Sequence, residues 1–184
     1  IEKAIRELDS KRLGKQRVEA YQILNCLLDA EEIIRRFSLP KDTPLLEAFK
    51  KCTSPLWCIP DSFGDRIYTD VKPTEPNARL VKKGFCSHPA VKMWRGYTDG
   101  LKYYINVTIS CWVERGYSNT MTWYHLREMP KFPPWTKSKI VHMSHRAALL
   151  RKEAVRNEPL WYWKNEEFTK DIYGTPWYTQ RGYL

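Results

Sequence analysis

One carboxylate, Glu19, stands among cationic and amide side chains in the segment LDSKRLGKQRVEAYQIL, residues 8–24. On a helix of about 100° per residue, these groups share one side, away from the apolar positions. The polar side holds Arg12, Lys15, Gln16, Glu19 and Gln22, and the apolar side holds Leu13, Ala20, Tyr21, Leu24, Leu27 and Leu28. Such a cationic face suits a polyanion. Spacing alone favours the alternative, an ordinary Lys15–Glu19 pair on a solvated surface that contributes only a few tenths of a kcal/mol.

Two residues of this segment do not fit a plain surface helix. Gly14 costs roughly 1 kcal/mol relative to Ala inside a helix, which indicates the close approach of a neighbouring backbone or a nucleic-acid strand. Arg17 falls within the apolar sector. Its guanidinium must therefore be paired or extend to water.

A second helix is predicted over residues 88–116, with Pro89 in its first turn and Gly116 at its end. One narrow stripe of this helix carries polar side chains, namely His88, Lys92, Arg95, Asp99 and Asn106. Trp94 lies on the apolar side, where a core position is favoured over base stacking. Gly96 and Gly100, four residues apart, would let another helix come close.

A third helix is predicted over about residues 138–156, within SKIVHMSHRAALLRKEAVR. His142 and His145 share a face, but two histidines without a third ligand are weak evidence for a metal site. Phosphate contacts are favoured instead, because donors near a helix start suit an anion. The residues expected to make them are His145, Arg146, Arg151 and Lys152. No metal or other cofactor is expected.

The elements that position these groups are mainly helical. Residues 2–37 predict a helix with a break near Asp9-Ser10, where either residue could be an N-cap, and residues 44–52 predict a short helix. Residues 38–87 carry several prolines and glycines and predict a long irregular insertion, with a small hairpin around DRIYTDVK. The expected architecture is a single compact helical domain over residues 1–184, completed by an aromatic-rich extended tail.

Composition narrows the class of partner. The 184 residues carry a net charge of +10, which favours nucleic acid first and an anionic membrane surface second. No apolar run reaches the roughly 18 residues of a membrane span, and no signal peptide is visible. The five cysteines are odd in number and lack paired spacing, so free thiols in a reducing compartment, cytoplasm or nucleus, are expected.

Three blocks in order, LDSKRLGKQRVEAYQIL, HPAVKMWRGY and SHRAALLRK, resemble the pyrimidine-dimer DNA glycosylase (endonuclease V-like) family, in particular its bacterial and large-virus members. The resemblance covers residues 8–24, 88–117 and 138–152 and leaves residues 38–87 unmatched. It implies that Arg12-Leu13 matches a His-Leu pair of the phage enzyme and that Glu19 matches its essential glutamate. The catalytic residues expected are Glu19, Arg12 and Gln16, and the nucleic-acid-binding residues expected are Lys11, Lys15, Gln22, His88, Lys92, Arg95, His145, Arg146, Arg151 and Lys152.

The resemblance implies base excision followed by strand scission. An amine attacks the anomeric carbon, the base leaves, a Schiff base forms and elimination cuts the backbone. Glu19 would stabilise the positive sugar and move protons, held ionised by Lys15 and Arg12. In the phage enzyme the nucleophile is the N-terminal amine, which the family places ahead of Ile1. The alternatives are an amine of Lys15 or Lys11, or the absence of lyase activity.

Three hypotheses about function follow. The first is a monomeric DNA glycosylase acting on damaged or modified pyrimidines in double-stranded DNA, with or without AP-lyase activity. The second is a non-catalytic nucleic-acid-binding protein of the same fold. The third is an N-glycosidic-bond hydrolase acting on RNA or nucleotides.

Overall fold

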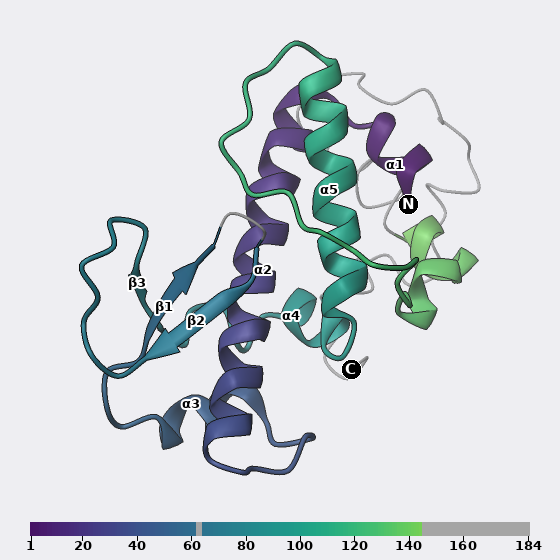
Figure 1. The fold of residues 1–184 in the computed structure, drawn as a ribbon. Helices are drawn as coiled ribbons and strands as arrows, with labels where there is room; N and C mark the ends of the chain where they lie inside the picture. Colours follow the sequence, from purple (N-terminus) through teal and green to yellow (C-terminus); the bar gives the residue numbers. More distant parts are fainter. Residues whose placement is uncertain (62–63, 145–184) are drawn as a thin grey trace. The chain divides into compact units, whose positions relative to one another are not determined.

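The computed structural model describes residues 1–61 and 64–144, and it is mainly helical, as predicted. The chain forms two compact units, Ile1–Lys131 and a second that begins at Phe132. The first unit is built around helix α2 (Ser10–Arg36), with helix α5 (Thr98–Glu114) alongside it and a small sheet on one flank (Figure 1). The prediction of one domain over residues 1–184 stays a prediction.

The break predicted near Asp9-Ser10 is confirmed. Helix α1 (Glu2–Arg6) ends ahead of it, and Asp9 is the N-cap of α2, its Oδ1 accepting a hydrogen bond from the backbone N–H of Arg12 at 3.0 Å. This bond satisfies one of the N–H groups that a helix start leaves without an intrahelical partner. Helix α2 therefore begins at a defined residue, which sets the rotation of every side chain along it.

The N-terminal half of α2 packs against α1 and α5. Ile5 of α1, Leu13 of α2 and Cys111 of α5 form one buried cluster, with Trp112 packed against it. A Cβ added at Gly14 would lie 3.1 Å from Cζ3 of Trp112. The close approach predicted at Gly14 is thus made by the Trp112 ring, neither by a backbone nor by nucleic acid.

The single helix predicted over residues 88–116 is wrong, because two helices occupy this stretch. Helix α4 (Pro89–Trp94) ends at Arg95, whose ψ is 130°, and Gly96 follows with φ +77° before α5 begins. A positive φ is strained for residues with a Cβ, so glycine permits the turn at this position. Gly96 therefore reorients the chain instead of admitting a neighbouring helix, and the polar stripe predicted across 88–116 is not continuous.

The prediction that residues 38–87 are irregular is wrong in part. They contain helix α3 (Leu45–Lys51), where a short helix was predicted, and strands β1 (Trp57–Pro60), β2 (Arg66–Thr69) and β3 (Arg79–Leu80). The strands form an antiparallel sheet of order β2-β1-β3. The hairpin predicted around DRIYTDVK exists, but its first strand is β1, upstream of that segment.

A buried carboxylate ties the sheet to α2. Asp29 is 1% exposed, and its two oxygens accept hydrogen bonds from Arg79 Nη2 and Nη1 at 2.7 and 2.8 Å. The hydroxyl of Tyr68 donates to Asp29 Oδ1 at 3.0 Å, and Arg66 Nη1 lies 3.6 Å from the same oxygen. Two strands are thereby fixed to one residue of the helix.

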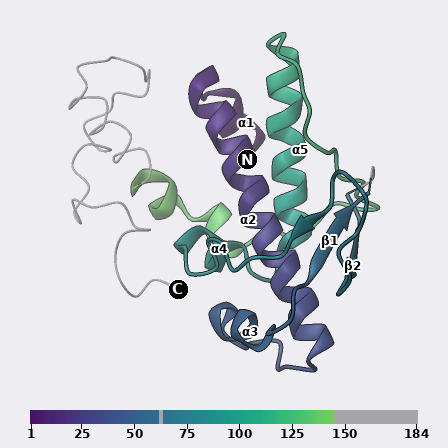
Figure 2. The same cartoon turned by 90° about the vertical axis from the view of Figure 1, so that its left-hand side faces the viewer.

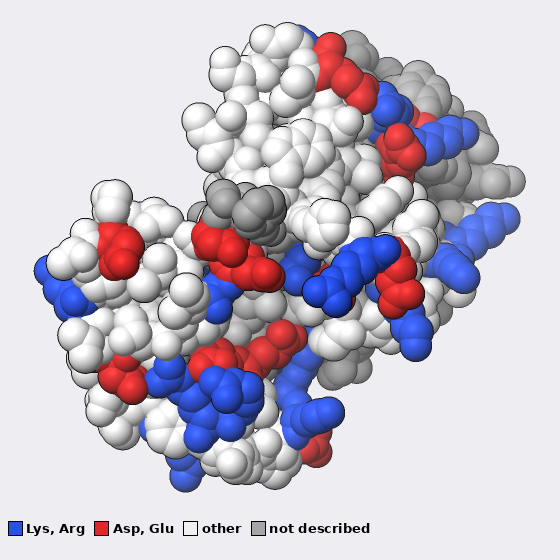
Figure 3. All heavy atoms as spheres, viewed as in Figure 1, with Lys and Arg blue, Asp and Glu red and all other residues white. Residues whose placement is uncertain are grey.

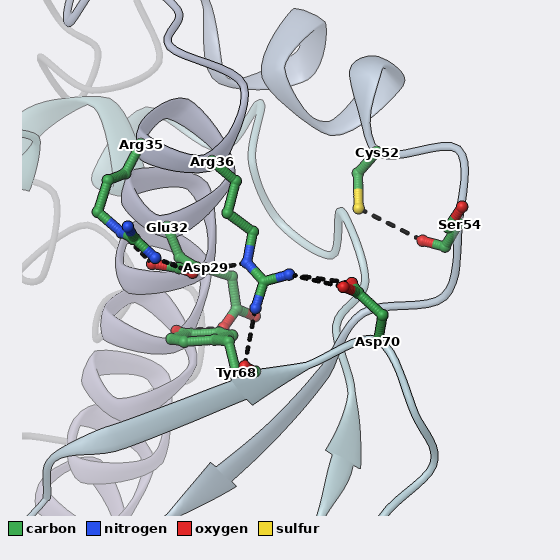
Figure 4. Close-up of polar contacts among 8 residues, drawn as sticks. All are labelled: Asp29, Glu32, Arg35, Arg36, Cys52, Ser54, Tyr68 and Asp70. Carbon is green, nitrogen blue, oxygen red and sulfur yellow. Dashed lines mark hydrogen bonds and ion pairs between the residues drawn. The ribbon is translucent and has the colours of Figure 1, made fainter.

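An outer group of ion pairs extends this junction toward solvent. Arg36 donates to Glu32 Oε1 at 2.7 Å, to the carbonyl of Tyr68 at 2.7 Å and to Asp70 Oδ1 at 3.0 Å (Figure 4). The C-terminal half of α2 is therefore covered by the sheet, by α3 and by the loops between them, whereas its N-terminal half keeps one side open.

The second unit is described as far as residue 144. It contains a 3₁₀ turn η1 (Pro134–Lys137) and helical residues 139–144, where the third helix was predicted; the remainder of that prediction lies outside the described residues. Within residues 1–61 and 64–144, no helix is both long and apolar enough to cross a membrane. All five cysteines are free thiols, as predicted.

Candidate active site

Glu19 lies on the side of α2 that is left open. Its side chain is 45% exposed, and its Oε1 lies 3.6 Å from Nζ of Lys15, which is 75% exposed. The neighbouring Lys11 and Gln22 are also exposed. The acid is thus neither sealed in the interior nor separated from cations, and a ligand can reach it from solvent.

A tyrosine of α5 orders the polar group next to Glu19. The hydroxyl of Tyr104 donates to Oε1 of Gln16 at 2.9 Å, and the Tyr104 ring lies 5.8 Å from that of Trp94 in α4. Burial, and after it the negative charge of Glu19, raises the pKa of Tyr104 above its ordinary value, so the phenol keeps its proton and acts as donor. Because the carbonyl of Gln16 is taken, its amide NH₂ is the end available to a ligand.

Arg12 pairs with Asp9, the N-cap residue of its own helix. Its Nη1 donates to Oδ2 of Asp9 at 2.7 Å, and the side chain is 21% exposed. Although burial raises the pKa of Asp9, the hydrogen bonds from Arg12 outweigh that effect and lower it. Lys15 is therefore the cation that the described contacts place on Glu19.

Arg17 is paired within the protein, as its place in the apolar sector requires. Its guanidinium carbon lies 4.3 Å from the centroid of the Trp112 ring, and Nη1 donates to Oδ1 of Asn119 at 3.0 Å. Burial lowers the pKa of Arg17. The guanidinium is therefore held between α2 and the segment that follows α5, where cation–π contact offsets part of its desolvation.

The predicted binding residues of the second block occupy different environments. His88 is the N-cap of α4, with Nδ1 accepting from the N–H of Ala90 at 3.2 Å, and both His88 and Lys92 are exposed. In the neutral ring this contact leaves the proton on Nε2, facing outward as a donor. Arg95 instead donates to the carbonyls of Lys41 and Thr43, each at 2.6 Å. Trp94 is 7% exposed, which confirms the core position predicted for it.

Asp99 and Asn106 do not join these groups. Asp99 pairs with Lys102 at 2.9 Å, and Asn106 exchanges two hydrogen bonds with the backbone of Tyr124, at 2.7 and 2.9 Å. Asn106 thus holds the segment after α5 against the helix, which is a structural role.

Sequence reasoning singled out His88 but not the segment before it, residues 82–87, which bounds the site. It crosses α2 between β3 and α4 (Figure 2), and the thiol of Cys26 donates to the carbonyl of Lys83 at 3.8 Å. Cys26 is 5% exposed, and burial raises its pKa to about 12. Cys26 and Glu19 are two turns apart on the same side of α2, so this segment closes the open side beyond Glu19. The sequence KKGFCSH could have indicated this segment, because two lysines precede a glycine that permits a turn.

One face and one hollow of the first unit are less suited to a polyanion. On the face shown in Figure 3, Lys and Arg side chains are interspersed with Asp and Glu. A hollow of about 270 Å³ is lined by residues of both signs, among them Glu31, Arg35, Asp65 and Lys102. It lies about 18 Å along α2 from Glu19. Mixed charge of this kind does not attract a phosphate backbone as an open cationic face does.

The four predicted binding residues of the third block, His145, Arg146, Arg151 and Lys152, lie outside the described residues. In the described part of the second unit, His142 Nε2 lies 2.8 Å from the carbonyl of Thr136. Within residues 1–61 and 64–144, no group of three or more His, Cys, Asp or Glu side chains is arranged to hold a metal ion.

The described geometry places an exposed carboxylate beside a lysine on a helical scaffold, and the comparison with known families gives the class of the protein. Residues 1–125 match the family model described as pyrimidine dimer DNA glycosylase, so the chain belongs to this family. It is therefore a DNA glycosylase, an enzyme that excises damaged pyrimidine bases from DNA. No curated protein and no solved structure shows significant similarity to the chain.

The extent of the family match corrects one expectation. The matched residues run through positions 38–87, which were expected to lie outside the resemblance, and they stop ahead of the third block at 138–152. The sheet and α3 therefore lie within the matched part of the chain. Membership selects the DNA glycosylase of the first hypothesis, whereas the monomeric state, the AP-lyase activity and the bacterial and large-virus branch stay predictions.

Proposed function

We propose that Glu19 is the catalytic carboxylate of the glycosylase reaction, with Gln16 beside it. The observation that carries the proposal is an ordered polar group at an open surface: Glu19 is half exposed, Lys15 contacts it, and Tyr104 fixes the orientation of Gln16. As the bond to the base breaks, positive charge develops on the sugar, and a fixed carboxylate stabilises that charge. The amide NH₂ of Gln16 can meanwhile donate to a carbonyl or phosphate oxygen of the bound nucleotide.

The test compares Glu19→Gln with a control variant, Glu47→Gln. Glu47 is an exposed glutamate of α3, outside the proposed active face. We expect Glu19→Gln to lose at least about 100-fold in single-turnover base release, the scale for general acid–base and charge-stabilising groups, while duplex binding survives. Glu47→Gln is expected to match the wild type. Unchanged release by Glu19→Gln would overturn the assignment.

The phosphate backbone is proposed to lie along the cationic side of α2 and the start of α4. Exposed donors line this path, namely Lys11, Lys15, Gln22, His88 and Lys92. Arg12 and Arg95 already donate to protein oxygens, through Nη1 and Nη2 respectively, and would contact phosphate through the other N–H groups of the guanidinium or by exchanging those contacts. His145, Arg146, Arg151 and Lys152 remain proposed contacts from the third block. Each lysine replaced by Gln should reduce the slope of log affinity against log salt by about 0.9 if it neutralises one phosphate.

We also propose AP-lyase activity through an amine of the protein. The amine nitrogen attacks C1′, the C1′–N bond breaks, and the base leaves with the electron pair and takes up a proton. Loss of the amine proton and ring opening then give an iminium, and removal of a C2′ proton expels the 3′ phosphate. Borohydride should trap the iminium as a covalent DNA adduct.

The same assay identifies the amine. If Lys15 or Lys11 is the nucleophile, replacement by Arg removes the trapped adduct while the cationic charge remains. If both variants still trap DNA, the nucleophile is another amine, such as one at the N-terminus. Base release with no adduct in any variant would show a glycosylase without lyase activity.

The proposed enzyme is a monomer that acts on double-stranded DNA in a reducing compartment. Five unpaired thiols support the reducing setting, since cysteines of oxidising compartments are usually paired. Sedimentation at several protein concentrations tests the monomer.

A further inference from the structure

An exposed aromatic ring stands beside the proposed active face. Phe85 is 53% exposed, and the residues around it in KKGFCSH are cationic or polar, with Lys82, Lys83 and His88 all exposed. Ile67 and Val71 are also exposed apolar side chains of the first unit, but they are aliphatic and lie in or next to the sheet. An apolar ring held in water among cations is typical of a contact surface.

The backbone holds this ring in a fixed position. The N–H of Cys86 donates to the carbonyl of Lys83 at 3.0 Å, and the N–H of His88 donates to the carbonyl of Phe85 at 2.7 Å. Gly84 has φ +43°, which permits the tight turn, and Cys86 is 4% exposed and anchors it. The Phe85 and His88 rings meet edge to face with centroids 6.2 Å apart. A ring preorganised in this way loses little conformational entropy on binding.

The turn lies within reach of the nucleotide that Glu19 would act on. The thiol of Cys26 contacts the carbonyl of Lys83, two residues before Phe85, and Cys26 is two helical turns from Glu19 on the same side of α2. The axial separation of Cys26 and Glu19 is about 10 Å, so the turn borders the part of α2 that carries the proposed active face.

We propose that Phe85 is a wedge that enters the base stack of the damaged duplex next to the extruded nucleotide, while Lys82 and Lys83 hold the adjoining phosphates. This inference rests on the proposed active face at Glu19. An extruded base leaves unstacked neighbours, and an apolar side chain inserted at that step replaces part of the lost stacking. The flanking ammonium groups neutralise phosphates that the resulting kink brings toward the protein.

The test uses the full chain, a duplex oligonucleotide carrying a pyrimidine dimer, and 2-aminopurine placed next to the lesion. Binding should raise the 2-aminopurine fluorescence as stacking is lost. Phe85→Ala should abolish most of that rise and weaken duplex affinity roughly 5- to 100-fold, the range for one aromatic–base stack. Phe85→Trp should retain both, and binding to the same strand without its complement should change less than threefold in Phe85→Ala.

Ile67→Ala is the matched control, because it removes an exposed apolar side chain from the sheet. Equal fluorescence and duplex affinity in Phe85→Ala and wild type would overturn the proposal, as would an equal loss on single-stranded DNA. The test of Phe85 is independent of the test of Glu19, because Glu19→Gln should lose base release yet keep the rise in 2-aminopurine fluorescence. Retained release by Glu19→Gln would refute the role of Glu19 and leave the fluorescence test of Phe85 standing.

Discussion

Replacing Asp29 by Asn should greatly lower the free energy of unfolding, although the two side chains have nearly the same shape. The carboxylate is 1% exposed and accepts two hydrogen bonds from Arg79 and one from Tyr68, with Arg66 3.6 Å away. An amide keeps one acceptor oxygen but turns an NH₂ group toward a guanidinium. Arg66 and Arg79 then lose their counter-charge, and Arg66, whose side chain is 5% exposed, has little access to water to replace it. Removing one partner of such a buried pair costs about 3–5 kcal/mol.

That loss is a large part of the total, since a domain of this size has roughly 5–15 kcal/mol of stability. The matched control is Asp70→Asn, because Asp70 also pairs with an arginine, Arg36, but is 67% exposed. Exposed pairs contribute about 0–1 kcal/mol, so the two variants should differ by at least 2 kcal/mol. Urea unfolding followed by tryptophan fluorescence and by circular dichroism measures both.

A spectroscopic readout tests the electrostatic part of the reasoning. Burial first, and the charge of Asp29 second, raises the pKa of Tyr68 above its ordinary value. Neutralising Asp29 removes the second cause, so Tyr68 should ionise at lower pH in folded Asp29→Asn than in the wild type, as seen by ultraviolet titration against Tyr68→Phe. A stability loss no greater than that of Asp70→Asn would refute the account of the junction.

Three further predictions concern the open half of α2. Gly14→Ala should destabilise by about 1 kcal/mol despite its better helix propensity, because its Cβ meets the Trp112 ring at 3.1 Å; in a Trp112→Leu background the same change should stabilise, as thermal unfolding will show. Tyr104→Phe should lower single-turnover base release about threefold to tenfold, and the loss should vanish in a Gln16→Ala background, whereas losses that multiply would show that Tyr104 does not act through Gln16. Asp9→Ala should cost about 1 kcal/mol at neutral pH through the lost cap. The pKa of Asp9 is lower in the folded protein than its unfolded value of about 3.9. The ionised carboxylate therefore stabilises the fold above about pH 3.9, and this contribution is lost as the pH falls through the folded pKa. The difference in unfolding free energy between Asp9→Ala and wild type should therefore become smaller in acid.

The helices of the open half were predictable because their signals are local. The spacing of apolar residues gave the buried side of α2, and an acidic N-cap at Asp9 gave its start. The same spacing placed Glu19 and Lys15 on the exposed side, where the structure has them. Rotation about a helix is set by sequence alone once its start is known.

The break between α4 and α5 was not predictable from periodicity. Apolar residues continue through Arg95-Gly96-Tyr97 at helical spacing, so the pattern describes one helix. The turn is stable because Arg95 binds two carbonyls of the loop before α3, a contact distant in sequence. A glycine inside a helical pattern is ambiguous until such a partner is known.

The sheet escaped prediction for a related reason. Its strands are two to four residues long, and their pairing partners are set by Arg79 and Tyr68 meeting Asp29 on a distant helix. A buried acid on α2 reads as an ordinary polar position until its partners are seen. Tertiary contacts of this kind override the weak strand preference of short segments.

The contacts of the cationic residues could not be predicted from the sequence either. Sequence gives the charge of Arg12 and Arg95 but not the carboxylate and carbonyls that compete for them. Lys11, Lys15 and Lys92 are exposed, and Lys15 also contacts Glu19 at 3.6 Å. The number of basic residues on a helix therefore does not tell how much of each side chain is available to phosphate.

The division of α2 into two halves explains why the proposed site lies where it does. Toward its C-terminus the helix packs against the sheet, which Asp29 binds, and against the segment after it, which Cys26 contacts. Toward its N-terminus α1, α5 and the segment after α5 pack against it, and among the described residues the side bearing Glu19 stays exposed. The boundary between the halves is the turn that carries Phe85. A duplex approaching the open half would therefore meet the carboxylate and, about 10 Å further along α2, the turn that carries the aromatic ring, where the protein closes over its own helix.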